Sequence, residues 1–461
     1  MAVEVNSSHI ADEKKEECGV VGIISKTGKD VAPLLYRALI ALQHRGQDAA
    51  GFAVWDGNKI DRKRGTGLVS EIFTPADIEI RGSLGIGHTR YPTIGGCKLC
   101  DVQPSVFGNI AVAHNGHIAN YDELKTRLEK AGYRYESTVD SEPMVYTLEG
   151  SDSLREGVTK IIEDFEGAFS DVCIFKDKLV VFRDQYSLRP LIWGENEDFI
   201  CFASESVALD INSILYKGEV LGGELVVVED GKLDREQLVE NKPHHCMFEY
   251  VYFSRPDSII NGECVFRARE RLGQELAREH PAKADLVIAV PDTARTAATA
   301  YGKAAGMEVC EGLIKNRYIG RTFIMPSQEE RAQAVKLKLN PLREVMEGKR
   351  VVLVDDSIVR GTTLREIVAL VRAAGAKEVH LRITSPQIKA PCFYGVDMST
   401  YKELIANQKT VDEIKEHLGA DSLGYLSIEG LKKAIGVPIC TACLDEKYHS
   451  DFVKKLAKSK K

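Results

Sequence analysis

The spacing of apolar and polar residues divides the chain into two parts of different character. In the first half, many short runs are apolar or alternate between apolar and polar residues, and Gly, Asn or Asp bounds them, which is typical of short β-strands. The pattern predicts strands at 18–24, 50–55, 82–87, 109–114, 171–176, 179–183 and 199–203. It predicts helices at 31–42, 121–131, 142–149 and 153–162. The first half is therefore expected to be rich in strands, with few helices.

The second half changes to an alternation of strands and helices after residues 253–257. The apolar runs predict strands at 285–290, 350–354 and 379–384, separated by helices at 294–305 and 364–374. Such alternation is typical of a parallel sheet with helices on its faces. We therefore expect an α/β two-domain chain, with the boundary near 245–256.

Composition and charge narrow the classes of protein. The 461 residues suffice for two or three domains of about 100–200 residues each. A formal net charge of -7 argues against a large surface for nucleic acid or for a membrane, and no apolar run approaches the ~20 residues of a membrane span. Residues 1–17 lack the basic start and apolar core of a secretion signal. We therefore expect a cytoplasmic protein whose eleven cysteines serve as ligands or in catalysis.

Cys18 follows a short charged leader, in the run 16–23. If residues 1–17 are removed, the chain begins with a cysteine that carries both a thiol and a free α-amine. A thiol is a good nucleophile as the thiolate, and an α-amine with a reference pKa of about 7.7–8.0 can accept its proton. One residue can then supply nucleophile and base. From this run alone, the alternative is a buried cysteine that opens a strand.

The most specific stretch is 351–363, where an apolar strand ends in Asp355 and Asp356 and a turn of small and hydroxyl residues opens a helix. Ligands on open α/β sheets bind at the carboxyl ends of strands. The N–H groups of a helix N-terminus suit a phosphate monoester, and two adjacent carboxylates suit ribose hydroxyls and a Mg²⁺ ion. A capped strand-to-helix turn explains the same residues equally well.

The same stretch resembles the phosphoribosyl pyrophosphate (PRPP) signature of type I phosphoribosyltransferases, and every position of that signature is filled. The resemblance implies a parallel-sheet domain with Mg²⁺ held by Thr293, Asp355 and Asp356. It implies PRPP contacts from Asp355, Asp356, Ser357, Ile358, Val359, Arg360, Gly361, Thr362 and Thr363. The run 316–324 resembles the mobile lid of the family, and from it Arg321 is expected to contact PRPP.

Cys18 and four later runs, 43–48, 87–91, 114–116 and 139–142, resemble in order the N-terminal-nucleophile (Ntn) glutaminase domain of glutamine amidotransferases. The resemblance implies an Ntn-hydrolase αββα sandwich in which Cys18 attacks glutamine. Arg90 would hold the substrate α-carboxylate, and Asp140 its α-ammonium. The Asn115 side chain and the Gly116 N–H would stabilise the oxyanion. Taken singly, 114–116 could be a hairpin turn and Arg90 a structural ion pair.

One departure from the glutaminase pattern is Ser187, where the family usually shows a glycine. We expect this departure to affect a turn and not the chemistry.

The cysteines form two candidate clusters. Cys440 and Cys443 have the spacing of a metal-binding pair, which alone predicts half a zinc site. The contexts of Cys246 and Cys392 resemble a subgroup of phosphoribosyltransferases with amidotransferase domains that carries a [4Fe-4S] cluster, and the resemblance implies that these four cysteines bind it in a structural role. Cys97 and Cys100 lie outside that pattern. We interpret them as a loop with two thiols, and the alternative is a site of adventitious metal binding or redox reactivity. We expect the remaining cysteines in the core: Cys173, Cys201, Cys264 and Cys310.

Both halves together resemble the amidophosphoribosyltransferase family over nearly all of the chain from Cys18 to about residue 448. The resemblance implies a propeptide at 1–17, a glutaminase domain at 18–250 and a phosphoribosyltransferase domain with the iron–sulfur segment at 251–461. It implies glutamine and PRPP as substrates, purine nucleotides as feedback inhibitors, and a homotetramer or homodimer. The alternatives are a sugar-phosphate amidotransferase, a nucleotide-sensing regulator, and an ammonia-only transferase whose leader is never removed.

Overall fold

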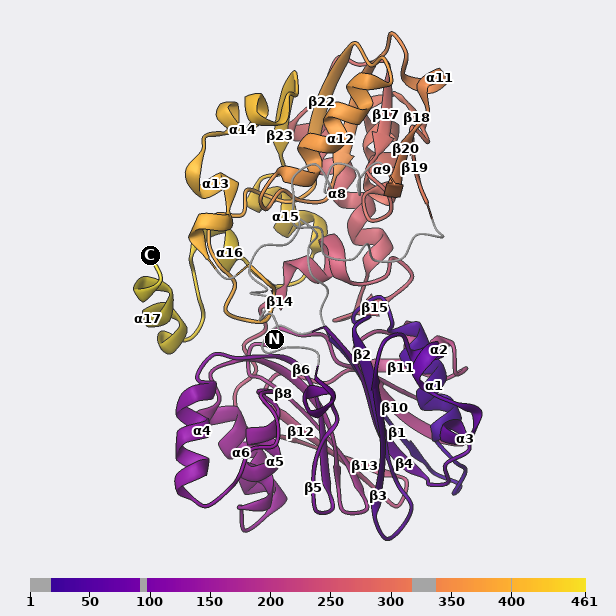
Figure 1. Ribbon diagram of the computed structural model, residues 1–461, viewed down its shortest axis with the longest axis vertical. Coiled ribbons are helices and arrows are strands. Elements are labelled where there is room, and N and C mark those ends of the chain that lie inside the picture. The colour runs from indigo at the N-terminus through magenta and orange to yellow at the C-terminus, as the bar shows by residue number, and fades with distance from the viewer. Residues whose placement is uncertain (1–17, 92–97, 317–336, 399) are drawn as a thin grey trace, which may run out of the picture.

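The computed structural model describes residues 18–91, 98–316, 337–398 and 400–461, and it contains two stacked antiparallel sheets in the first part of the chain (Figure 1). The first sheet has the strand order β11-β9-β10-β1-β4-β2-β3. The second has the order β13-β12-β8-β7-β6-β5. The strands of the first sheet are β1 (Gly19–Ser25), β2 (Ala49–Trp55), β3 (Ile60–Thr66), β4 (Leu84–Arg90), β9 (Ile192–Glu195), β10 (Phe199–Ala203) and β11 (Leu215–Glu219). Those of the second are β5 (Ser105–Phe107), β6 (Ile110–Ile118), β7 (Gly167–Phe175), β8 (Lys178–Arg183), β12 (Glu224–Glu229) and β13 (Lys232–Gln237).

Helices cover the outer face of each sheet, so the first domain has four layers (Figure 1). The first sheet is covered by α1 (Ala32–Ala41), α2 (Val69–Ile72), α3 (Pro75–Ile78) and α7 (Val207–Asp210). The second is covered by α4 (Tyr121–Lys130), α5 (Glu142–Glu149) and α6 (Leu154–Asp164). In β1, Val20 and Ile24 face the other sheet whereas Val21 and Ile23 face the helices. Because both faces are buried, this strand is a continuous apolar run, and the predicted αββα sandwich is confirmed.

The second part is built on a parallel sheet with the order β18-β17-β21-β22-β23. Its strands are β17 (Leu286–Ala289), β18 (Glu308–Cys310), β21 (Arg350–Asp355), β22 (Glu378–Ile383) and β23 (Ser422–Tyr425). One face is covered by α8 (Val265–Glu279), α9 (Arg295–Ala305) and α15 (Ile428–Ile435). The other is covered by α11 (Arg343–Met346), α12 (Thr362–Ala373) and α14 (Val411–Leu418). The predicted parallel-sheet α/β domain is thereby confirmed.

Short elements complete the chain and join the two domains. In the second domain, near the parallel sheet, lie β19 (Leu313–Lys315), β20 (Leu339–Pro341), η3 (Tyr401–Glu403) and α13 (Ile405–Gln408). In the first domain, η1 (Leu99–Asp101) precedes β5. The junction comprises β14 (His245–Cys246), a turn of π-helix η2 (Glu249–Phe253), β15 (Ile259–Ile260), β16 (Glu263–Cys264), β24 (Ile439–Cys440), α16 (Ala442–Asp445) and α17 (Asp451–Ser459). Because β14 pairs in parallel with β24, the C-terminal segment returns to the domain boundary (Figure 1).

Several expectations need correction. The strand predicted at 109–114 continues to Ile118, so Asn115 and Gly116 lie within β6 and the hairpin-turn alternative is wrong. Cys173 and Cys201 are buried as expected, but Cys264 and Cys310 are partly exposed because they lie in short strands at sheet edges. The strand β3 was not predicted, since the sequence IDRKRGT is polar and forms the edge of its sheet.

The turn at Ser187 has a positive φ of 52°, a conformation that glycine adopts without steric cost. The departure from the family pattern therefore falls on a turn, and the Ser187 carbonyl accepts hydrogen bonds from Arg183 and His245. Among the residues described, no helix is both long and apolar enough to span a membrane.

Candidate active sites

The first candidate site lies where β1 and β4 meet. Cys18 immediately precedes β1, and the register places Gly19 opposite Thr89. The Cys18 Sγ donates to the carbonyl oxygen of Tyr91 at 3.5 Å. This pairing brings the predicted nucleophile beside the end of β4, where Arg90 is 4% exposed.

A hydrogen bond between the two sheets brings a second strand to the same place. The Nε2 of His88 lies 3.1 Å from the carbonyl oxygen of His114 in β6. Side chains two residues apart on a strand point to the same face, so Arg90 points toward the second sheet, as His88 does. Cys18, Arg90 and the strand that carries Asn115 therefore converge at one end of the sandwich.

Asn115 carries a buried donor that no described residue uses. The residue is 1% exposed, and across the described parts of the chain its Nδ2 has no hydrogen-bond partner. Buried polar groups nearly always have a partner, so an orphaned amide donor is suited to a ligand. Next to it, Gly116 has φ +154°, and a Cβ there would lie 1.9 Å from the carbonyl oxygen of Ala168. Only glycine can occupy this position in β6.

Asp140 is brought to the same strand by a turn in front of α5. Its Oδ2 accepts from the Ile118 N–H at 3.0 Å and lies 3.8 Å from Nε2 of His114 and from Nδ1 of His117. The turn is held by Glu142, whose carboxylate accepts the N–H groups of Glu136 and Ser137 at 2.8 and 2.9 Å. Asp140 is thus a nearly buried carboxylate beside β6, the strand that also carries Asn115 and Gly116.

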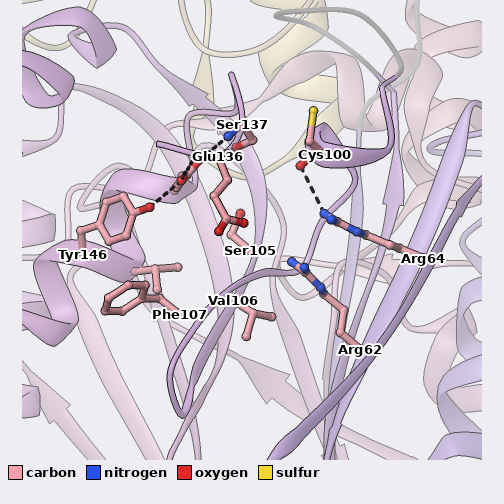
Figure 2. Close-up of a pocket in the computed structure, with 11 residues that line it drawn as sticks. Arg62, Arg64, Cys100, Ser105, Val106, Phe107, Glu136, Ser137 and Tyr146 are labelled. Carbon is pink, nitrogen blue, oxygen red and sulfur yellow. Dashed lines mark hydrogen bonds between the residues drawn. The ribbon is translucent and has the colours of Figure 1, made fainter. Parts of the chain in front are cut away.

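A pocket lies beside the 136–142 turn and is separate from the predicted glutamine residues. Figure 2 shows Arg62 and Arg64 extending from β3 toward Glu136, with Tyr146 and Phe107 opposite. Arg64 donates to the carbonyl oxygen of Cys100 at 3.2 Å. The cavity volume is about 30 Å³, room for little more than a water molecule. None of the predicted catalytic residues lines it, and Cys97 lies outside the described residues.

Two buried histidines support this end of the sandwich, and sequence reasoning assigned them no role. Burial lowers the pKa of His88 well below its usual value, and the charges of Arg90 and His114 lower it further. Burial also opposes the charged form of His114, but Asp171, 2.8 Å away, and Asp140 raise the pKa of His114 above its usual value. His88 is therefore held neutral, whereas the charged form of His114 is favoured next to Asp140.

The second candidate site lies at the carboxyl ends of β17 and β21. These strands pair in parallel, with Ala289 opposite Val354, so the segments that follow them emerge at one edge of the sheet. Thr293 Oγ1 donates to Asp356 Oδ2 at 2.5 Å. The Asp355 carboxylate accepts the N–H of Asp356 at 2.8 Å. The structure thus joins Thr293 to the two adjacent carboxylates.

The rest of the predicted PRPP run forms the turn into α12. Ser357 donates to Asp356 Oδ1 at 3.1 Å, and Ile358 is 2% exposed. Gly361, the residue before the helix, has φ +81° and no side chain to cap the first N–H groups. The Val359 carbonyl accepts from Ile405, and Arg360 pairs with Glu403 at 3.2 Å. This turn leads into the helix at Thr362 and Thr363, and Arg321 with the rest of 317–336 lies outside the described residues.

The donor set at this edge fits a hard cation. Carboxylate and hydroxyl oxygens are the ligands that Mg²⁺ prefers, together with substrate phosphate oxygens. Asp355, Asp356 and Thr293 supply two carboxylates and one hydroxyl. Within the described residues, no three or more His, Cys, Asp or Glu side chains form a metal site by themselves.

The four predicted cluster cysteines gather at the junction. Cys246 lies opposite Cys440 in the register of the parallel strands β14 and β24. Cys440 and Cys443 are each 8% exposed. Burial raises the pKa of Cys443 well above its usual value, and Cys392, Cys440 and Cys246 raise it further, so all four thiols lie near one another. The Tyr394 N–H donates to Cys392 Sγ at 3.3 Å. Four thiols in an apolar setting fit an iron–sulfur cluster, although they do not form a compact metal-ligand group in the described chain.

Sequence reasoning also missed a buried ionic group around Arg45. Arg45 is 1% exposed and contacts Glu205 and Glu249, at 2.6 and 2.7 Å. Arg45 lies in one of the runs that carried the resemblance, but its partners are 160 and 204 residues away in sequence. No pattern in the sequence links residues at such separations.

Comparison with known proteins gives the same two domains. The glutamine amidotransferase domain family matches residues 98–210, and the phosphoribosyl transferase domain family matches residues 257–418. The chain is 47% identical to an amidophosphoribosyltransferase of Methanothermobacter thermautotrophicus and 43% identical to one of Bacillus subtilis, with 95% of both chains covered in each case. The B. subtilis glutamine PRPP amidotransferase complexed with ADP and GMP matches with a TM-score of 0.88 and 41% identity, covering 94% of this chain and 98% of that chain. A structure described as the allosteric regulatory enzyme of purine biosynthesis matches with a TM-score of 0.88 and 42% identity, covering 94% and 97%.

Proposed function

The chain belongs to the amidophosphoribosyltransferase family of purine biosynthesis, and from that premise we propose that its two sites act in sequence. The first releases ammonia from glutamine, and the second transfers that ammonia to PRPP. Together they convert glutamine, PRPP and water to phosphoribosylamine, pyrophosphate and glutamate. The observation that carries the proposal is the Asn115 amide donor, which is buried without a described partner near Cys18. The same chain brings Thr293 into contact with Asp356 at the second site.

In the glutaminase, removal of residues 1–17 leaves the α-amine of Cys18 free to accept the thiol proton. The sulfur then bonds to the amide carbon, and the carbonyl electrons move onto the oxygen. The Asn115 Nδ2 and the Gly116 N–H stabilise this oxyanion. The C–N bond breaks, the nitrogen leaves as ammonia with the proton from the α-amine, and water hydrolyses the thioester to glutamate.

Two charged residues orient glutamine in this site. Arg90 holds the α-carboxylate through a two-pronged contact, which its direction toward the second sheet supports. Asp140 holds the α-ammonium, which its near burial beside β6 supports. The amide of the substrate then lies between Cys18 and Asn115.

In the transferase, the carboxylates of Asp355 and Asp356 hold the ribose hydroxyls, and the turn 357–363 holds the 5-phosphate at the start of α12. Thr293, Asp355 and Asp356 would hold Mg²⁺, which when bound neutralises charge on the departing pyrophosphate. Arg321 is assigned to PRPP by resemblance alone. Ammonia attacks the anomeric carbon as the bond to pyrophosphate breaks. Exclusion of water at that moment is assigned by resemblance to the run 316–324, of which 317–324 lie outside the described residues.

Cys246, Cys392, Cys440 and Cys443 would hold a [4Fe-4S] cluster with a structural role, because no step of the reaction is a redox step. The cluster would tie β14 to β24 and so the domain junction to the C-terminal segment. A thiol nucleophile and thiolate ligands need a reducing compartment, and we therefore place the enzyme in the cytoplasm.

Three further assignments complete the proposal. The domains are the propeptide 1–17, the glutaminase 18–250 and the transferase with the cysteine segment 251–461. Purine nucleotides inhibit the enzyme, an assignment supported by the relative complexed with ADP and GMP. The chain forms a homotetramer or homodimer, which sedimentation of the purified enzyme would measure.

A pair of variants tests the division of labour between the sites. Cys18→Ala should abolish glutamate release but leave pyrophosphate release with ammonia as the nitrogen source. Asp356→Asn should abolish pyrophosphate release with either nitrogen source. Loss of ammonia-dependent activity in Cys18→Ala, in a protein that is still folded, would contradict the assignment.

A further inference from the structure

A single buried guanidinium links the nucleophile to two carboxylates. The Arg45 Nε donates to the backbone carbonyl of Cys18 at 3.0 Å. Its Nη1 donates to Glu205 at 2.6 Å and to Glu249 at 2.9 Å, and its Nη2 donates to Glu249 at 2.7 Å. Two parallel bonds to one carboxylate fix the plane of a guanidinium. The orientation of the Cys18 carbonyl is therefore set by the position of Glu249.

Glu249 belongs to the junction and is held from the side of the second domain. It begins η2, whose Tyr250, Val251 and Phe253 pack in the core beneath α8 and α9. The buried Arg269 of α8 donates to the carbonyl oxygens of Tyr250, Tyr252 and Ser254. The Ser254 hydroxyl donates to Glu249 at 2.7 Å. A movement of α8 relative to the glutaminase would thus reach the carboxylate that orients Arg45.

The same carboxylate is also near the oxyanion strand. Nη1 of Arg189 lies 3.8 Å from Glu249 Oε1, and Arg189 donates to the Tyr394 carbonyl. A Cβ on Gly395 would lie 2.8 Å from Arg189 Nη2 and 3.4 Å from the carbonyl carbon of Gly116. Glu249 therefore lies between two guanidinium groups. That of Arg45 holds the Cys18 backbone, and that of Arg189 lies near Gly395, which is itself close to Gly116.

On the basis of the proposed function, we propose that Glu249 is a positioning residue of the glutaminase, supplied by the junction with the second domain. It touches neither substrate. It acts by holding Arg45, and through Arg45 the backbone of Cys18, in the geometry that attack on glutamine requires. In the described chain, the Glu249 carboxylate bonds to Arg45, Arg189 and Ser254. None of these three is a proposed PRPP or Mg²⁺ residue, so ammonia-dependent transfer does not depend on Glu249.

The test measures glutamine-dependent and ammonia-dependent pyrophosphate release of Glu249→Gln in the full-length enzyme. Glutamine keeps the size of the side chain but loses the charge and one acceptor oxygen. A displacement of catalytic groups by about 1 Å can cost about 10²-fold in rate. We expect the glutamine-dependent kcat to fall by about 10²-fold, with KM for glutamine and the ammonia-dependent rate unchanged. The matched control is Glu224→Gln, which breaks a similar two-bond pair with Arg235, at 2.6 and 2.7 Å, on β12. It should leave both rates unchanged.

If Glu249→Gln keeps the wild-type glutamine-dependent rate, the inference about Glu249 is wrong, but the proposed function still stands. If Glu249→Gln does not fold, Arg45→Lys decides, because one ammonium group cannot bond the Cys18 carbonyl and both carboxylates as the guanidinium does. It should show the same selective loss, and an equal loss of both activities would overturn the inference. A wild-type enzyme without any glutamine-dependent rate would instead contradict the proposed function and remove the inference with it.

Discussion

The hydroxyl of Thr293 donates to the carboxylate of Asp356 across 2.5 Å, although 63 residues separate them in sequence. The contact exists because β17 and β21 are neighbouring parallel strands whose carboxyl ends meet at one edge of the sheet. Such an edge is where open α/β sheets bind ligands. The same relation explains how two short runs, far apart in the chain, become one site.

The first prediction concerns this contact. Thr293→Ala should lower pyrophosphate release about tenfold or more with glutamine and with ammonia alike, because a hydrogen bond to a charged group is worth about 1.5–3 kcal/mol. The matched control is Thr299→Ala on α9, whose exposed hydroxyl donates to the Arg295 carbonyl of its own helix. Steady-state kinetics with varied PRPP measures both. An effect confined to the glutamine-dependent rate would contradict the placement of Thr293 in the transferase.

The second prediction concerns the orphaned amide. Asn115→Ala should reduce glutaminase kcat by about 10²–10³-fold, the usual effect of removing one oxyanion donor, and should leave ammonia-dependent transfer intact. Asn109→Ala, at the exposed turn before β6, serves as the control. Glutamate release reports the effect. If the loss appears as a higher KM for glutamine at unchanged kcat, Asn115 binds the ground state and is not an oxyanion donor.

The third prediction concerns maturation. The active enzyme should begin at Cys18, and its intact mass should lack residues 1–17. In a variant that retains the leader, the α-amine belongs to Met1 and not to Cys18, so the variant should transfer ammonia but not release glutamate. Mass spectrometry of the assayed sample decides this point, and a glutamine-dependent enzyme with an intact leader would rule out the α-amine as the base.

The fourth prediction concerns the cysteine cluster. Cys443→Ala should remove the iron and acid-labile sulfide and lower the thermal stability of the junction, because the three remaining thiols cannot complete the ligand set. Cys310→Ala, in the partly exposed strand β18, should keep the iron. Iron and sulfide are measured on anaerobically purified protein. Wild-type protein that contains no iron, and is nevertheless more stable than the Cys443→Ala variant, would argue for bare thiols.

The fifth prediction concerns pH and Glu205. Burial opposes its charged form, but the charges of His44 and Arg45 and the hydrogen bond from Ser258 hold the pKa of Glu205 well below its ordinary value of 4.5. A carboxyl with a lowered folded-state pKa stabilises the fold above the unfolded pKa and loses that contribution as pH falls below it. Removing one partner of a buried ion pair costs about 3–5 kcal/mol.

Glu205→Gln should therefore be less stable than wild type at pH 7, and the difference in unfolding free energy should shrink as pH falls below 4.5. Denaturant unfolding at several pH values measures this. A difference that is constant from pH 7 to pH 3 would show that the charge of Glu205 does not carry the effect.

The sequence was sufficient to predict the local structure of a site whose residues follow one another in the chain. Asp355 to Thr363 form one strand, turn and helix start, so the apolar run and the hydroxyl-rich turn predicted the local structure directly. Predicting Asn115 depended on resemblance, because three residues of a hairpin-like pattern turned out to lie inside β6. Its orphaned donor became visible only with the packing of the second sheet.

The sequence was insufficient where function depends on long-range burial. Glu249 and Arg45 are individually ordinary charged residues, and only the folded junction shows that both are removed from solvent and paired. The role of His88 in joining the two sheets likewise depends on their stacking. Charged edge strands such as β3 carry no apolar pattern and could not be predicted from periodicity.

The central claim is that one chain takes nitrogen from glutamine at Cys18 and delivers it to PRPP at Asp355 and Asp356. The most direct test measures pyrophosphate and glutamate released by anaerobically purified enzyme, with PRPP, Mg²⁺ and glutamine as the only nitrogen source. The account predicts that both products form in equal amounts and that pyrophosphate release stops without glutamine. Pyrophosphate release only when ammonia is added would contradict it.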